Sequence, residues 1–234
     1  MTIPGLIAAP GLVASLGSTP PTITYRGQVR VYDNVTSANA SITISDEGNS
    51  CIVIVGCCSN AGQQRQVSSV SVGGVGGSLS ANLFNNGGEY SSDKRIYVCN
   101  NVPSGTVTFN MAVNGNLASY SGQAVAYECN LPFASVTPAD TVQTTGNSGT
   151  LTTSENGIIA GICMYRQQTG DSNNLSPMGN QVVTSPIWNE PYIRNGCSVT
   201  TSGGDITASC TGPSAGTAIS LHGLVAASWT EDNF

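Results

Sequence analysis

The sequence predicts an all-β protein whose strands form an antiparallel β-sandwich of jelly-roll or immunoglobulin-like type, with a closed barrel as the second choice. No stretch keeps the apolar periodicity of an α-helix. Short runs rich in Val, Ile and Thr recur instead, at intervals of roughly 8–12 residues. Gly, Pro, Asn and Ser, which favour turns, separate these runs. Many short strands between turns are typical of sandwiches and barrels.

Several strands are expected in the N-terminal half. SITI (41–44) and RIYVC (95–99) have the length of short strands, and VSSVSVGGVGG (67–77) is β-branched before it becomes rich in glycine. CIVIVGCC (51–58) is apolar throughout, which predicts a central strand covered on both faces.

The clearest alternation follows in VTFNMAV, from Val107 to Val113. Every second residue of this segment is large and apolar, so one face of the strand should be buried. Asn114-Gly115 is a strong signal for a tight hairpin turn. We therefore expect this strand to pair with the next one, LASYSGQAVAYEC (117–129).

The C-terminal part has fewer strand signals. TLTTS (150–154), GIIAGICMY (157–165) and AISLHGLVAASW (218–229) are the expected strands. The polar stretches 130–149 and 166–181 are expected to be loops.

The domain organisation follows from these segments. We expect an apolar N-terminal arm over residues 1–25 and a single sandwich domain over residues 26–234, with residues 130–149 as the boundary if the domain has two lobes. MTIPGLIAAPGLVASLG contains two prolines and no Lys or Arg, so it matches neither a signal peptide nor a membrane span. It is expected to be either a free arm or one that docks on a neighbouring subunit.

CSVTTSGGDITASC (197–210) reads as a hairpin with a cysteine at each end. A turn centred on Gly203-Gly204 would place Cys197 opposite Cys210 at a non-hydrogen-bonded position, where Cα atoms lie about 4.5 Å apart. A disulfide accepts Cα separations of about 4.4–6.8 Å. The alternative is two thiols packed across the strands, and the redox state of the compartment decides between them.

The other cysteines are expected to fill the core. The chain has eight cysteines but no C-x-x-C pair, and its one histidine is His222, so zinc and iron–sulfur spacing is unsupported. Cys57 and Cys58 are adjacent and should point to opposite faces. We expect no metal and no cofactor.

No enzyme motif is apparent. A lone His222 in a strand is usually structural, and a G-x-S-x-G nucleophile elbow is absent. Most of the acidic residues lie in turn-like contexts, but Glu128 follows a strand pattern, for which a buried partner such as an arginine is favoured over catalysis. We expect the protein not to be an enzyme.

Charge excludes two classes of partner. Only 9% of residues are charged, the net charge is −6, and Lys94 is the only lysine. Nucleic-acid binding needs a stripe of basic residues, and a polybasic membrane patch is also missing. We expect neither nucleic-acid binding nor membrane insertion.

The order of the segments resembles a known group of proteins. CIVIVGCC precedes VSSVSVGG, RIYVC and NVPSGTVTF follow, and AVAYEC, TLTTSENGIIAGICM and AISLHGLVAASW close the series over residues 40–230. This order resembles a loose group of β-sandwich proteins of tailed bacteriophages and bacteria, which are virion surface proteins or secreted adhesion-like proteins. The resemblance implies no catalytic residue, and the high cysteine content departs from the group.

Two functions are expected from these observations. The first is a structural virion protein, either a capsid decoration protein or a head or tail appendage, which is assembled in the host cytoplasm and associates with itself and with other capsid or tail proteins. The alternative is a carbohydrate-binding or adhesive module of a secreted or virion protein that binds a host surface glycan. Its candidate stacking residues are Tyr90, Trp188, Tyr192 and Trp229.

Overall fold

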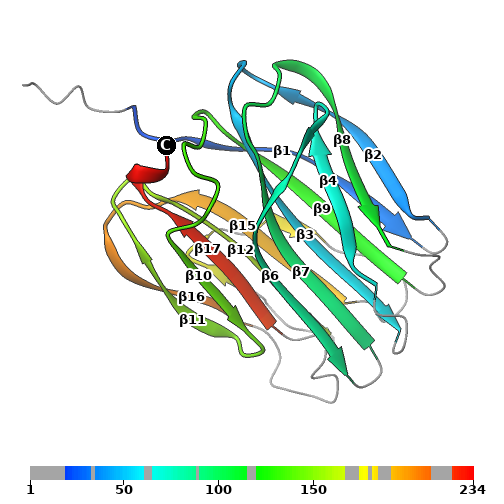
Figure 1. The fold of residues 1–234 in the computed structure, drawn as a ribbon. Helices are drawn as coiled ribbons and strands as arrows, with labels where there is room; N and C mark the ends of the chain where they lie inside the picture. Colours follow the sequence, from blue (N-terminus) through cyan, green and yellow to red (C-terminus); the bar gives the residue numbers. More distant parts are fainter. Residues whose placement is uncertain are drawn as a thin grey trace, which may run out of the picture.

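The computed structural model places most of the chain in antiparallel strands, which confirms the predicted all-β class. It describes residues 19–32, 35–60, 65–87, 90–114, 120–166, 174–178, 181–183, 191–211 and 223–234. The strands form four sheets, none of which closes into a barrel in the described ranges. These sheets stack as successive layers (Figure 1).

The first half of the chain builds two of the sheets. Sheet A contains, in spatial order, β1 (Ile23–Tyr32), β9 (Tyr120–Cys129), β3 (Ser50–Asn60), β7 (Tyr90–Cys99) and β6 (Ser78–Gly87). Sheet B contains β2 (Ser37–Ile44), β8 (Gly105–Val113), β4 (Val67–Val72) and β5 (Val75–Gly76).

The second half builds the other two sheets. Sheet C contains β10 (Asp140–Thr144), β17 (Gly223–Trp229), β12 (Ile158–Arg166), β15 (Pro191–Val199) and β14 (Gln181–Val183). Sheet D contains β11 (Ser148–Thr153), β16 (Gly204–Thr211) and β13 (Asn174–Ser176). A short 3₁₀ helix, η2 (Glu231–Asn233), follows β17.

Three apolar cores separate the four sheets. The B/A core lies between sheets B and A, the A/C core between sheets A and C, and the C/D core between sheets C and D. Because side chains alternate along a strand, β3 sends Val53 into the B/A core and Ile54 into the A/C core. The prediction that residues 51–58 form a central strand covered on both faces is confirmed.

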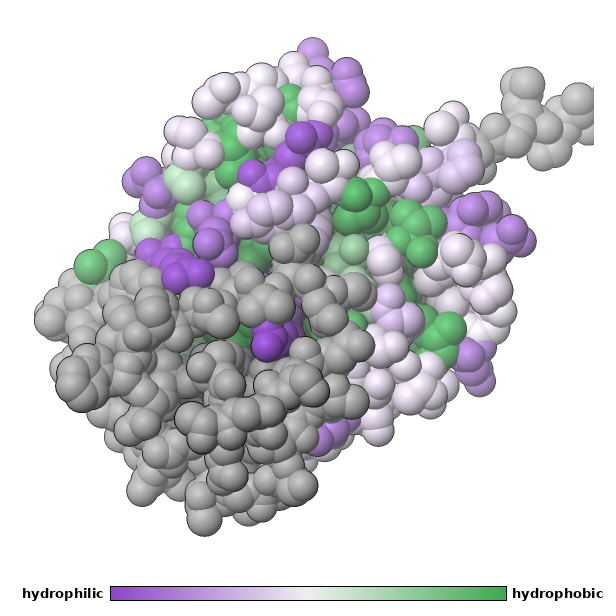
Figure 2. Space-filling view, turned by 180° about the vertical axis from the view of Figure 1, so that it is seen from behind, coloured by the Kyte–Doolittle hydropathy of each residue, from purple (hydrophilic) through white to green (hydrophobic). Residues whose placement is uncertain are grey.

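The outer faces of the stack carry short uncharged polar side chains. On sheet B, Ser41 lies opposite Thr108, and on sheet D, Thr150 lies opposite Thr207. All four of these residues are exposed. The described surface in Figure 2 is accordingly mostly white, with scattered hydrophobic and hydrophilic residues. Hydroxyl groups therefore predominate on the two outer layers, and Asp205, opposite Thr152, is an exposed acidic residue on the outer face of sheet D.

The change from the first pair of sheets to the second falls within the predicted boundary 130–149. Residues 130–139 connect the two halves, but β10 and the start of β11 lie inside the predicted loop. The C-terminal part closes its own core although its strand signals are sparse, and the A/C core joins it to the N-terminal part.

Three other sequence expectations are corrected. The arm cannot extend to residue 25, because β1 already begins at Ile23; residues 1–18 lie outside the described ranges. The turn predicted at Asn114-Gly115 does not join two paired strands, because β8 pairs with β2 and β4 whereas β9 belongs to sheet A. The predicted loop 166–181 contains the strand β13.

Candidate functional site

The first polar cluster surrounds Glu128 on β9, at the edge of the B/A core. Its carboxylate accepts hydrogen bonds from the Arg26 guanidinium, from the Asn49 side-chain amide and, at 2.9 Å, from the Ser45 backbone N–H. Glu128 is 3% exposed. An arginine partner was predicted for this residue, and that prediction is confirmed. The carboxylate is fully engaged, so the cluster ties β1 and the turn before β3 to β9.

The second cluster lies on β7, where Asp93, Lys94 and Arg95 follow one another. Asp93 accepts a 2.9 Å hydrogen bond from the Val67 backbone N–H and a 3.0 Å hydrogen bond from Arg95 Nε. Burial raises the pKa of the Asp93 carboxyl, and the Arg95 guanidinium opposes this shift. Arg95 also donates to Gln66 Oε1 at 2.8 Å.

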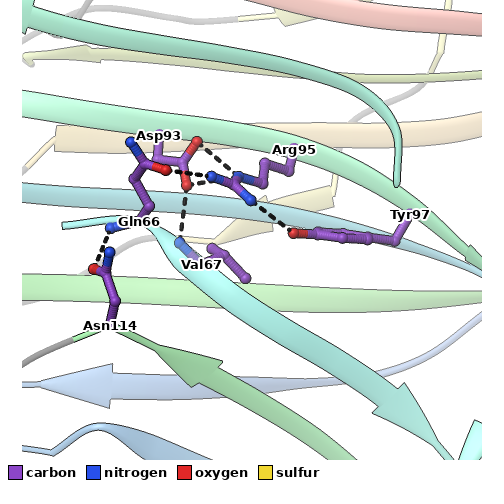
Figure 3. A network of polar contacts seen from close by, with 6 residues as sticks. All are labelled: Gln66, Val67, Asp93, Arg95, Tyr97 and Asn114. Carbon is purple, nitrogen blue, oxygen red and sulfur yellow. Dashed lines mark hydrogen bonds and ion pairs between the residues drawn. The ribbon is translucent and has the colours of Figure 1, made fainter. Parts of the chain in front are cut away.

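The contacts of Gln66 extend this network into sheet B (Figure 3). The Gln66 backbone N–H donates to Asn114 Oδ1 at 2.8 Å, directly after β8, and Arg95 donates to Tyr97 Oη at 3.2 Å. The network therefore joins β7 of sheet A to the beginning of β4 and the end of β8. Its carboxylate and guanidinium neutralise each other, which suits a structural clamp.

Lys94 points the opposite way, into the A/C interface, and is completely buried. Its ammonium donates to Ser92 Oγ at 2.9 Å. Burial lowers the pKa of Lys94 to about 8, against the effect of the neighbouring Cys163, Asp93 and Cys58 side chains. The sequence showed this lysine only as the one lysine of the chain. Its position between Asp93 and Arg95 shows only that it faces away from both of them, because side chains alternate along a strand.

The lowered pKa gives Lys94 the chemistry of a reactive amine. A partly neutral amine can act as a base or form a Schiff base with a carbonyl compound. The protein itself surrounds it, however: a Cβ atom added at Gly223 would lie 3.4 Å from Lys94 Nζ. In the described structure Lys94 is a buried amine and not the floor of an open site.

A terminal pocket of about 200 Å³ is lined by residues from both ends of the described chain. These two ends lie close together in Figure 1. Its walls are largely apolar, and its acidic group, Glu231, accepts a 3.2 Å hydrogen bond from Asn156 Nδ2. Beneath it, Phe133 packs edge-to-face against both Trp229 and Phe234. The lining residues are Thr19, Pro21, Leu131, Pro132, Asn156, Glu231 and Phe234.

Of the aromatic residues predicted to stack on sugars, Trp229 alone has a described side chain. The prediction for Trp229 is wrong, because its side chain is fully buried in the A/C core and its indole N–H donates to Val136 O at 3.2 Å. The strand pattern that ends at this tryptophan did not show that both faces of the strand are covered. Trp188 and the side chains of Tyr90 and Tyr192 lie outside the described residues, as does His222.

The predicted pairing of Cys197 with Cys210 is wrong. β15, which carries Cys197, pairs with β12 and β14, and β16, which carries Cys210, pairs with β11 and β13. The chain passes from sheet C to sheet D between them, and Thr200 anchors this crossing through a 2.8 Å hydrogen bond from its N–H to Gly157 O. The expected hairpin assumed that both strands share a sheet. No disulfide bond joins any of the eight cysteines, which all lie in the described ranges, and seven of them are buried.

The described residues contain no group of three or more His, Cys, Asp or Glu side chains arranged to hold a metal ion. Within the same ranges, no helix has the length and apolar character required to cross a membrane.

Comparison with known proteins gave no relative. No family model matches the sequence, and neither a curated protein nor a solved structure matches the chain.

Proposed function

We propose that the protein is a structural subunit of a phage virion, either a capsid decoration protein or a head or tail appendage. It acts by associating with copies of itself and with other virion proteins. The observation that carries this proposal is the terminal pocket, because the apolar N-terminal segment joins the folded part of the chain at its wall. The resemblance in segment order to virion surface proteins supports the location.

The occupant we assign to the terminal pocket is the N-terminal segment of a neighbouring copy. Residues 1–17 are mostly apolar and carry no charged side chain, and an apolar segment exposed to water promotes association. Seventeen extended residues span about 60 Å, whereas a chain of this length has a radius of gyration of roughly 17 Å. The segment can therefore reach a second copy, and reciprocal exchange would give a closed symmetric oligomer.

The walls of the terminal pocket suit such an occupant. Pro21, Leu131, Pro132 and Phe234 offer apolar surface, and apolar burial contributes about 25 cal/mol per Å². The carboxylate of Glu231 is already hydrogen-bonded to Asn156. The N-terminal segment has no lysine or arginine that would need a free acidic partner. The apolar walls of the pocket therefore match the apolar side chains of the segment.

The test is the oligomeric state of the full chain by size-exclusion chromatography with light scattering. We expect an oligomer for the full chain, a monomer for a variant lacking residues 1–17, and weaker association for Pro132→Asp. Thr150→Asp, on the outer face of sheet D, is the matched control for an added surface charge and should leave the oligomer intact.

The location is tested by mass spectrometry of purified particles of the phage that encodes the chain. A stoichiometric structural protein is expected there. A full chain that stays monomeric and is missing from the particles would overturn the proposal. If that monomer bound a defined sugar on a glycan array, the adhesive function would replace it.

A further inference from the structure

Cysteine side chains meet in pairs in the two outer cores of the stack. The first pair lies in the B/A core, where Cys51 on β3 is directly opposite Cys99 on β7. Both residues are fully buried in that core. Directly opposite residues of antiparallel strands have Cα atoms about 4.5–5.5 Å apart, which lies within the disulfide range of about 4.4–6.8 Å.

The second pair lies in the C/D core. Cys163 comes from β12 of sheet C and Cys210 from β16 of sheet D, and both side chains belong to the same buried cluster. Their thiols are hydrogen-bonded to each other, which raises the pKa of Cys163 and lowers that of Cys210. This contact brings the two sulfur atoms together across the C/D core.

We propose that Cys51 and Cys99 form one disulfide bond and Cys163 and Cys210 a second one when the chain folds in the presence of a disulfide oxidant. In each step two S–H bonds break and one S–S bond forms. The two protons and two electrons reduce one molecule of a small disulfide, such as oxidised glutathione, to two thiols. The bonds would form during folding, because both pairs are buried once the sheets have stacked.

The two bonds would join different parts of the stack. The first links neighbouring strands of sheet A. The second links sheet C to sheet D, whose strands share no backbone ladder in the described residues. Each bond closes a loop of about 50 residues, which lowers the entropy of the unfolded chain in the chain-entropy model. With the unfolding entropy usual for a protein of this size, each bond should raise the melting temperature by about 10 °C.

Cys57 offers a matched control for this chemistry. It is a fully buried thiol of the B/A core, as are the first pair, but its directly opposite residues on the neighbouring strands are Asp93 and Gly122. Cys57→Ala therefore removes a buried thiol without removing either proposed bond.

The experiment compares the full chain refolded with oxidised glutathione and with a reductant. Both samples are denatured, alkylated and analysed by intact mass and by peptide mapping without reduction. We expect peptides joining Cys51 to Cys99 and Cys163 to Cys210 only after oxidation. Cys210→Ala should lose the second bond and about 10 °C of the oxidised melting temperature, and Cys57→Ala should keep both bonds.

Three results would overturn the proposal. One is a folded oxidised protein in which all eight cysteines are alkylated. Another is a map in which Cys210 is joined to Cys197 instead of Cys163. The third is a Cys57→Ala variant that loses either bond. The mapping of the unmodified chain decides the matter even if a cysteine variant fails to fold.

Discussion

Replacing Lys94 with methionine should stabilise the protein at neutral pH. The side chain is completely buried, and burial lowers its pKa from 10.5 to about 8. Each pKa unit corresponds to about 1.4 kcal/mol. The lowering from 10.5 to about 8 therefore means that the buried charge of Lys94 destabilises the folded state by about 3 kcal/mol. Methionine has a similar length and no charge. Loss of the hydrogen bond to Ser92 offsets about 1 kcal/mol, which leaves a net gain of about 2 kcal/mol.

The same substitution should remove a pH dependence of stability. Because the pKa of Lys94 is lower in the folded state than in the unfolded state, the folded protein releases this proton first as the pH rises. The destabilisation of the folded state by the buried charge is complete below about pH 8 and disappears as the pH approaches 10.5. The advantage of Lys94→Met over the unmodified protein should therefore shrink across this window. Cys163, Asp93 and Cys58 act electrostatically on Lys94 and are present in both proteins, so comparison at each pH separates their titration from that of the lysine.

The measurement is urea denaturation under reducing conditions at pH 7, 8, 9 and 10.5. At pH 7 the melting temperature should also rise, by about 4–8 °C. Lys94→Gln is the control, because it removes the charge but buries an amide that must find new hydrogen-bond partners. This variant should lose the pH dependence of stability but should gain less stability at pH 7 than Lys94→Met. A Lys94→Met protein less stable than the original at pH 7, or a stability difference that stays constant up to pH 10.5, would refute this reasoning.

Other substitutions test the packing around Glu128 and the last strand, all by urea denaturation. Glu128→Gln keeps the shape of the side chain but leaves the Arg26 guanidinium without its carboxylate, so the free energy of unfolding should fall by about 2 kcal/mol. Combining it with Arg26→Met should recover part of this loss. Two additive losses would contradict the pairing. Gly157→Ala places a Cβ 2.7 Å from Trp229 O and should lose about 2 kcal/mol. Gly76→Ala, which meets nothing within 4 Å, should stay within about 0.5 kcal/mol; equal effects of the two alanines would argue against the close contact. Trp229→Phe removes the partly buried 3.2 Å hydrogen bond to Val136 O and should lose about 1–3 kcal/mol of stability. An unchanged stability would argue against that bond.

The sequence predicts strands and their covered faces well because these are local properties. The apolar run at 51–58 and the alternation from Val107 to Val113 both describe burial that the structure confirms. The arginine partner of Glu128 was predictable for a similar reason, because a carboxylate within a strand pattern needs a compensating charge.

Which strands share a sheet was not predictable. Asn114-Gly115 and Gly203-Gly204 both favour a reversal of the chain, but neither turn joins two paired strands. A turn sequence specifies a local change of direction. Which strand pairs with which depends instead on how the sheets stack to bury their apolar faces. The buried Lys94 escaped detection because sheet C, built from distant residues, is what covers it.

The A/C core has a consequence for how the chain is made. Sheet A is complete once residue 129 has left the ribosome, but its second apolar face waits for β12, β15 and β17, the last of which ends at Trp229. At about 5–20 residues per second, synthesis of the intervening hundred residues takes roughly 5–20 s. During this time Ile52, Ile54 and Ile96 of the nascent chain remain uncovered. A chaperone that binds apolar strands should therefore associate with polypeptides arrested near residue 150 and release those that have passed residue 229.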